Sequence, residues 1–370
     1  MMKIKRIYLF FFTYMASMYF AQTLLVFWLS KKGYNFSDLV IYYLISYIVA
    51  LLGIILFPKI KMQAKHSMFW GIIFSAMMVF TLIKIFSSSQ LILSAMFSGL
   101  NIIFFWIPYN IMHFKFSHED RRGFHSGMYF LITPIIGITL QPLAGVVAEK
   151  FGFETLFSIG VALYLIPIIL LTLVPNFEFA IDIRNELLTH KFNWSTFFQG
   201  VALRINWSFI PIFTLLYVVT PSAFGNFFGF LALISGIASV INGFISDKIK
   251  KRKVFFYVFS SFLVLSFLFL PFASDSLTWY IFAGISSLGI YLANPFWLAF
   301  NIDYYKDLGI EKTMILREVF LNSGYVAVLF LGLIVFYFTS SPKVALAVVS
   351  FVALLLPVVS YFQGVYRVKM

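Results

Sequence analysis

Hydrophobic residues fill long stretches of the chain, and short polar segments separate these stretches. Each stretch has roughly 20 apolar residues, the length that an α-helix needs to cross the hydrocarbon core of a bilayer. The pattern predicts an all-α polytopic membrane protein with twelve spans and no soluble domain. The predicted spans are 7–30, 36–57, 67–86, 90–114, 123–149, 152–174, 193–219, 223–246, 254–272, 276–300, 314–338 and 343–366.

Composition supports this fold class. The chain is 61% hydrophobic and 11% charged, whereas soluble proteins have about 45–50% apolar and about 25% charged residues. The 49 Phe residues exclude a disordered chain. The absence of Cys excludes disulfides, thiolate zinc sites and iron–sulfur clusters. The basic start does not indicate a signal peptide, because the apolar stretch that follows is too long and has no A-x-A site.

Lysine and arginine fall mainly on one side of the predicted spans. If the N-terminus is cytoplasmic, twenty of the 27 basic residues lie inside, four lie outside and three lie within spans. The positive-inside rule therefore predicts that both termini are cytoplasmic. The net charge of +13 then reflects topology and attraction to anionic lipid heads, so we do not expect nucleic acid as a partner.

The longest polar interruption, 175–192, divides the chain into two halves of six spans. We predict an N-terminal bundle at 1–174, a cytoplasmic linker at 175–192 and a C-terminal bundle at 193–370. A weak repeat supports this division, since Phe-Trp-Ile-Pro-Tyr-Asn at 105–110 resembles Asn-Pro-Phe-Trp at 294–297, at equivalent places in the halves. Transporters are commonly built from such repeats, with the substrate site between them.

A motif follows the eighth span. The run from Gly243 through Asp247 and Lys248 to the basic residues 250–253 resembles the signature of the major facilitator superfamily, G-x-x-x-D-[RK]-x-G-[RK]-[RK]. That signature lies between the second and third spans of the family and recurs between the eighth and ninth, where this copy falls. Lys250 stands where the family prefers Gly.

Two further segments resemble the same family. The first-half copy of the signature keeps Gly53 and Lys59 but has Phe57 at the Asp position, followed by Pro58. The family's "RG … P-x-x-G-G … G-W-R-x-x-F" run has a counterpart with offset glycines and without Trp-Arg. Its members here are Arg121-Arg122-Gly123, Pro134, Gly137, Pro142, Gly145, Phe151-Gly152-Phe153 and Phe157.

The signature loop predicts a cytoplasmic gate. Gly243 allows close helix packing, and Asp247, next to Lys248, is suited to pair with the positive N-terminus of a facing helix. Pseudo-symmetry makes that helix the span 123–149, with Arg121 and Arg122 beside it. An incidental Asp in a basic loop is the alternative interpretation.

Charged residues inside spans are candidates for function. Arg204 lies near the middle of span 193–219, which is too deep for its charge to reach the interface easily, and it shares a helix face with Trp207, Ser208 and Pro211. It fits either an anionic or strongly hydrogen-bonding substrate or a structural link. Glu318 is the one acidic residue clearly inside a predicted span, so it is the candidate for proton coupling, although a structural pair with Arg317 is the alternative.

The resemblance implies that the first, fourth, seventh and tenth spans line a central cavity. Aromatic and amide side chains on these spans suit sugars or amphiphiles, although interfacial anchoring and helix packing are alternative roles. The candidate cavity residues are Tyr14, Gln22, Asn101, Trp106, Arg204, Trp207, Tyr291, Asn294 and Trp297.

No nucleotide-binding loop or metal motif occurs, and the five His residues have no metal spacing. We therefore expect a monomeric transporter of the cell membrane, without cofactor, metal or catalytic residues. It would move a small polar or anionic solute by alternating access, either facilitated or coupled to a proton or another ion. The alternatives are an exporter of lipophilic compounds or lipid flippase on the same fold, and a membrane-embedded enzyme or assembly scaffold.

Overall fold

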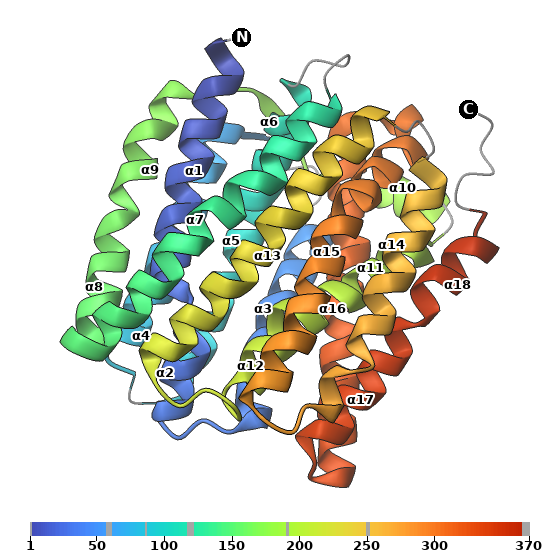
Figure 1. Cartoon of the computed structure of the whole chain (residues 1–370). Helices are drawn as coiled ribbons and strands as arrows, with labels where there is room; N and C mark the ends of the chain where they lie inside the picture. Colours follow the sequence, from blue (N-terminus) through green and yellow to red (C-terminus); the bar gives the residue numbers. More distant parts are fainter. Residues whose placement is uncertain are drawn as a thin grey trace.

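The structure, a computed structural model, describes residues 2–56, 61–85, 87–116, 122–189, 192–248 and 252–364. Long helices make up almost all of this part of the chain (Figure 1). Eleven of the described helical segments are long and apolar enough to cross a membrane. The fold is therefore that of an all-α, multi-pass membrane protein, which confirms the predicted fold class.

The first half of the chain contains six predicted spans, and kinks or short breaks divide several of them. Three spans are single helices, and a π-helical turn interrupts the fourth. The elements are α1 (Met2–Gln22), α2 (Leu25–Lys31), α3 (Phe36–Leu56), α4 (Ala64–Ile83), α5 (Ser88–Asn101), η1 (Ile102–Trp106), α6 (Ile107–Lys115), α7 (Arg122–Phe151), α8 (Phe153–Leu163), α9 (Leu165–Leu170) and η3 (Leu171–Leu173).

The second half is built in the same way. Its helices follow a short helix in the connecting segment, and 3-10 turns lie at two of the connections. The elements are α10 (Arg184–Thr189), α11 (Trp194–Arg204), η4 (Ile205–Phe209), α12 (Ile210–Thr214), α13 (Pro221–Lys248), α14 (Arg252–Phe267), η5 (Leu270–Phe272), α15 (Ser276–Tyr304), η6 (Lys306–Leu308), α16 (Gly309–Thr339), α17 (Pro342–Ala353) and α18 (Leu355–Phe362).

The predicted span 193–219 is the one that does not meet the length and hydropathy criteria for crossing a membrane. It is nevertheless helical from Trp194 to Thr214, through α11, η4 and α12. Gln199, Arg204 and Asn206 lie within it and lower its hydropathy, and all three are buried by neighbouring helices. The segment can be this polar because protein covers it on nearly every side.

Local sequence explains several helix boundaries. Asp275 caps α15 by accepting a hydrogen bond from the Thr278 backbone N–H at 2.9 Å, and Ser87 caps α5 in a reciprocal capping box with Gln90. The turn between α7 and α8 occurs at Gly152, whose φ is +85°. Because side chains with a Cβ rarely adopt this conformation, Gly152 permits the abrupt change of direction.

α7 and α13 run side by side through the centre of the molecule (Figure 1). Glycines let these two helices approach closely. A Cβ on Gly145 would lie 2.6 Å from the Pro221 carbonyl oxygen, and one on Gly225 would lie 2.5 Å from that of Gln141. The Glu149 carboxylate also accepts a hydrogen bond from the Ser222 backbone N–H at 2.8 Å. These contacts join the two halves toward the Glu149 end of α7.

A small β-sheet that the hydropathy pattern does not predict joins a loop of the first half to the segment between the halves. Strand β1 (Lys61–Gln63) pairs antiparallel with β2 (Glu178–Ala180). The Lys65 ammonium donates to the Thr172 carbonyl at 2.7 Å, which reinforces this connection. The division of the chain at 175–192 stays a prediction, and β2 and α10 are the described elements within it.

Candidate substrate site

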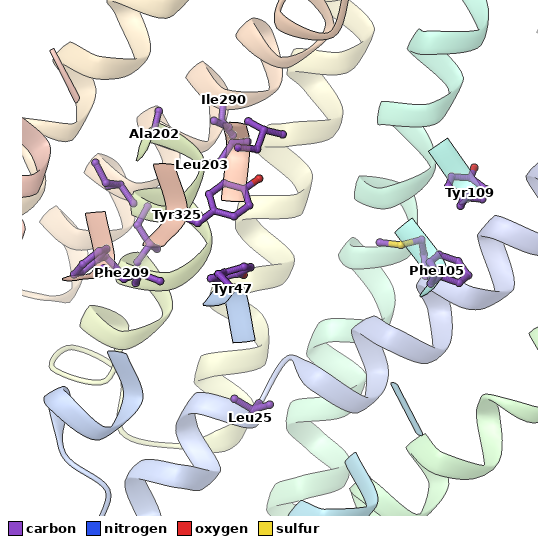
Figure 2. Packing of buried hydrophobic residues seen from close by; sticks show 14 of the residues in the cluster. Leu25, Tyr47, Phe105, Tyr109, Ala202, Leu203, Phe209, Ile290 and Tyr325 are labelled. Atoms are coloured by element: carbon purple, nitrogen blue, oxygen red, sulfur yellow. The ribbon is translucent and has the colours of Figure 1, made fainter. Parts of the chain in front are cut away.

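Arg204, at the end of α11, lies among aromatic rings from three helices. Its guanidinium carbon is 4.2 Å from the ring centroid of Tyr325 on α16, 4.5 Å from that of Tyr47 on α3 and 5.2 Å from that of Trp207 on η4. Figure 2 shows Tyr47 and Tyr325 next to each other, from opposite halves of the chain. Arg204 is 7% exposed, so these rings provide cation–π stabilisation in place of water.

The local helix geometry at Arg204 has a cause in the sequence. Pro211 has no backbone N–H, and its ring would clash with a regular helix before it. The chain forms the π-helical turn η4 immediately before Ile210 and Pro211. π-Helical turns of this kind are frequent at functional sites. A second such turn, η1, precedes Ile107 and Pro108 in the fourth span.

Three polar atoms near η4 are buried without a hydrogen-bond partner. They are Nε of Arg204, Oδ1 of Asn206 and Oγ of Ser208. Buried polar atoms are normally paired with protein, water or ligand, and each exception requires an explanation. A polar ligand or water at this segment would provide that explanation.

Glu318 and Arg317 form an ion pair on α16. The distance between the Arg317 Nη1 and the Glu318 Oε1 is 2.7 Å, and both side chains are largely buried. The Asn322 amide donates to the Glu318 carbonyl at 2.7 Å. Glu318 is also close enough to Arg204 for the two charges to interact. The structure therefore brings both predicted intramembrane candidates into one electrostatic cluster, although their roles stay predictions.

Tyrosines connect this cluster to the first half of the chain. Tyr129 of α7 lies near Arg317 and Glu318, and its hydroxyl donates to the Asn110 amide oxygen at 3.2 Å. The Tyr291 hydroxyl lies 3.4 Å from Thr133 Oγ1, between α15 and α7. Polar groups from both halves thus meet at the centre of the molecule.

Other predicted cavity residues face the interior of a single half. The Tyr14 hydroxyl is hydrogen-bonded to the Asn101 amide and lies 3.2 Å from Ser75 Oγ. The Gln22 amide donates to Tyr164 at 2.8 Å. These bonds link α1 to neighbouring helices of its own half, as would be expected of groups that stabilise packing.

Trp106, Trp297 and Asn294 also lie apart from Arg204's ring contacts. Trp106 is partly buried against Phe11, Tyr14, Phe105 and Tyr109. The Trp297 indole N–H donates to Ser260 at 2.8 Å within the second half, and Asn294 is buried on the same helix. Of the other eight predicted cavity residues, Trp207 is the one in contact with Arg204.

The structure does not describe the side chains of the predicted gate residues. Arg121 lies outside the described residues, and the side chains of Arg122, Gly243, Asp247 and Lys248 are likewise not described. The prediction that they form a gate therefore remains a prediction.

Two ion pairs elsewhere connect α16 to the first half and to the segment between the halves. The Lys115 ammonium of α6 lies 3.0 Å from the Glu311 carboxylate of α16. The next residue, Lys312, pairs with Glu186 of α10. Sequence inspection missed both pairs because neither occurs in a recognisable motif; their only signal was opposite charge at predicted helix ends.

The described residues contain no group of three or more acidic or His side chains arranged to hold a metal. Tyr47 and Tyr325, which cover Arg204, were also missed by sequence reasoning. Both lie on spans that the family resemblance does not place around the cavity. Only their depth, comparable to that of Arg204, could have indicated them.

Comparison with known sequences identifies a distant relative. No protein-family model matches the chain. A curated relative, the uncharacterized protein YqgE of Bacillus subtilis, is 22% identical over 243 residues, which cover 61% of this chain. The match spans 56% of the length of that relative.

Solved structures match nearly the whole chain. A POT family transporter in complex with 5-aminolevulinic acid has a TM-score of 0.70 and 11% identity, covering 99% of this chain and 96% of its own. A POT family transporter in complex with a thioalcohol-conjugated peptide also has a TM-score of 0.70, with 12% identity and the same coverage.

The fucose:proton symporter FucP of E. coli, as the N162A variant, has a TM-score of 0.68 and 12% identity, and the match covers 98% of each chain. The chain therefore has the fold of major facilitator transporters, as the sequence motif predicted. The matching structures are transporters, and what this chain shares with them is the fold.

Proposed function

We propose that this protein is a secondary transporter that moves a small anionic or polar solute by alternating access. The observation that carries the proposal is Arg204, a buried cation between the two halves with an unpartnered Nε. A guanidinium deep in a membrane protein is costly unless it has a partner. A solute that binds there would supply the partner, and rocking of the halves would expose it to either side.

Glu318 is the proposed coupling residue. It is the one carboxylate among the described residues that lies far from both ends of a spanning helix, and it is paired with Arg317. Protonation of Glu318 would break that pair and change the charge beside Arg204. Binding of a proton at Glu318 would in this way affect binding of a solute at Arg204. A POT family transporter in complex with a conjugated peptide and a fucose:proton symporter have the same fold as this chain.

The cytoplasmic gate is proposed to contain Asp247 and Lys248, with the Lys115–Glu311 pair as a second contact. We also propose that both termini are cytoplasmic, which the basic loops support, and that the protein lies in the cell membrane. We also propose that one chain is sufficient for transport, because the central polar residues come from both halves of the same chain.

Purified protein in proteoliposomes tests the proposal. Uptake and efflux of a panel of radiolabelled organic acids, sugars, amino acids and amines would be measured with and without a pH gradient. The proposed transport function requires saturable movement of at least one solute, and this movement must not occur in protein-free vesicles. Acceleration by an inward proton gradient supports coupling, whereas equal rates support a uniporter. Consumption of a substrate by chemical conversion, without any translocation, would refute the transport function.

A further inference from the structure

The charged groups deep in the described spans do not balance. Arg204 lies near the middle of the helical run Trp194–Thr214, and Arg317 and Glu318 lie well inside α16. Arg317 and Glu318 pair with each other at 2.7 Å, which leaves the positive charge of Arg204 without a carboxylate of its own. One further negative charge beside Arg204 would make the cluster neutral, and burying a charge is much less costly when it is paired.

The rings around Arg204 restrict where that charge can bind. Tyr47 and Tyr325 lie against the guanidinium, with ring centroids at 4.5 and 4.2 Å from its carbon. The two centroids are 4.9 Å apart, so both rings are on the same side of it. Oxygen acceptors bind a guanidinium in its plane, along its N–H bonds. The buried, unpartnered Nε provides such a donor. A planar anionic group, such as a carboxylate, is suited to this site because it accepts hydrogen bonds from guanidinium N–H groups, of which the Nε–H has no protein partner.

Trp207 provides the second part of the site. It is 40% exposed, whereas every other residue from Gly200 to Thr214 is buried or nearly so. Its ring also lies beside the Arg204 guanidinium, at 5.2 Å. A large aromatic surface is therefore accessible next to the anion position, in the middle of an otherwise covered helix. Flat rings stack favourably on such a surface.

We propose, building on the transport function above, that the cargo is a monovalent organic anion with a flat ring. Its carboxylate would bind the edge of Arg204, and its ring would stack on Trp207. A cationic solute would be repelled by Arg204, and a dianion would leave the cluster negative. A zwitterion would need a second carboxylate for its ammonium group, and Glu318 is engaged by Arg317.

Isothermal calorimetry on the purified full chain in nanodiscs tests this class with defined probes. Phenylacetate and indole-3-acetate carry one charge and a flat ring. Cyclohexylacetate keeps the charge without the flat ring, 2-phenylethanol and phenethylamine change the charge, and phenylsuccinate adds a second carboxylate. We expect the two aromatic monoanions to bind, and to bind tighter than cyclohexylacetate by about two- to tenfold, the range typical of aromatic pairs.

Variants at Trp207 separate stacking from charge. Trp207→Phe should retain the preference for flat rings, and Trp207→Leu should abolish it while cyclohexylacetate binding stays unchanged. Trp194→Leu is the matched control, because Trp194 is an exposed Trp at the start of the same segment, 49% exposed. It should bind all probes as the wild type does.

The outcomes are distinguishable from failure of transport itself. Equal binding of cyclohexylacetate and phenylacetate, preferred binding of the amine, the alcohol or the dianion, or no binding of any probe would each overturn the proposed class. Saturable transport of a sugar or amine in proteoliposomes would also overturn it, yet would leave the transporter assignment intact. Binding of aromatic monoanions without their translocation would support the site and refute transport.

Discussion

Arg204 and Tyr47 lie on opposite halves of the chain, with the guanidinium carbon 4.5 Å from the ring centroid. The contact joins α11 to α3 at the centre of the molecule, where Figure 2 shows Tyr47 facing Tyr325. Any rocking of one half against the other must change this contact. Arg204 is therefore placed where, under the proposed function, both a bound solute and the relative position of the halves would affect it.

Substitution of Arg204 separates a binding role from a structural one. Arg204→Gln removes charged hydrogen bonds worth about 1.5–3 kcal/mol each, so solute affinity should fall by roughly 10- to 150-fold. Arg204→Lys retains the charge but loses the planar fork, and an intermediate loss is expected. Equilibrium binding of the solute found in the transport panel is the measurement, with melting temperature recorded for each variant. Wild-type affinity combined with earlier melting would make Arg204 a structural residue.

Glu318→Gln should uncouple proton movement from solute movement. The amide has nearly the same shape but cannot exchange a proton, and it weakens the pair with Arg317. Net uptake driven by a pH gradient should be lost, whereas exchange of labelled for unlabelled solute across the membrane should persist. A pH-sensitive dye inside proteoliposomes reports the proton flux. Glu154→Gln is the control, since Glu154 is an exposed carboxylate in the first turn of α8 and takes no part in the proposed gate or site. Full proton flux in Glu318→Gln would exclude this residue from coupling.

Much of the fold could be predicted from the sequence because a bilayer requires long apolar helices. The seventh predicted span shows where this signal weakens. Between Trp194 and Thr214 the polar Gln199, Arg204 and Asn206 reduce the hydropathy, yet the segment is helical and buried. Its prediction as a span rests on the apolar residues that surround these three polar ones.

The candidate site was less predictable. The depth of Arg204 could be estimated from helix rise, and the contact with Trp207 from helical spacing. Tyr47 and Tyr325 could not be assigned, because their meeting depends on how α3 and α16 pack across the two halves. Tyr14 and Asn101 have the same residue types as a cavity lining, and only tertiary structure shows that they bond to each other.

Reversal of the Lys115–Glu311 pair tests the second gate contact. Both side chains are more than a third exposed, so the pair is expected to contribute at most about 1 kcal/mol. Lys115→Glu should therefore raise the cytoplasmically open population by no more than about fivefold, and adding Glu311→Lys should restore it. The chain has no native Cys. The rate at which an alkylating reagent, added from the cytoplasmic side, modifies the Ser239→Cys variant is therefore a clean measurement.

Asp247→Asn extends the same experiment to the motif residue. Loss of its carboxylate should raise the alkylation rate of Ser239→Cys and lower transport, if the side chain holds a facing helix end. Ser276→Cys, at the opposite end of the molecule, should react more slowly in both gate variants. An unchanged rate at Ser239→Cys in the Asp247→Asn background would reject the proposed latch.

The cap of α15 gives stability a defined pH dependence. Backbone hydrogen bonding from Thr278, together with the Ser274 hydroxyl, lowers the pKa of Asp275. A carboxyl with a lowered pKa in the folded state stabilises the protein above its unfolded pKa, and this contribution is lost as the pH falls through the folded pKa. Asp275→Ala should therefore lower the melting temperature at neutral pH and differ less from the wild type in acid. A constant difference between the two across this range would contradict the assignment.

Glycine at position 324 should be essential for the geometry of the site. A Cβ there would collide with the Phe197 carbonyl oxygen on α11, and backbone atoms cannot move aside as a flexible side chain can. Gly324→Val would push α16 away from α11, and with it Tyr325 and Glu318 away from Arg204. Overpacking of this kind costs about 1–3 kcal/mol, so earlier melting and weaker solute binding are both expected. Gly236→Ala is the control, because its nearest neighbour would be Pro134 at 3.6 Å, an ordinary contact distance. If Gly324→Val melts and binds as Gly236→Ala does, close packing of α11 against α16 does not position the Arg204 cluster.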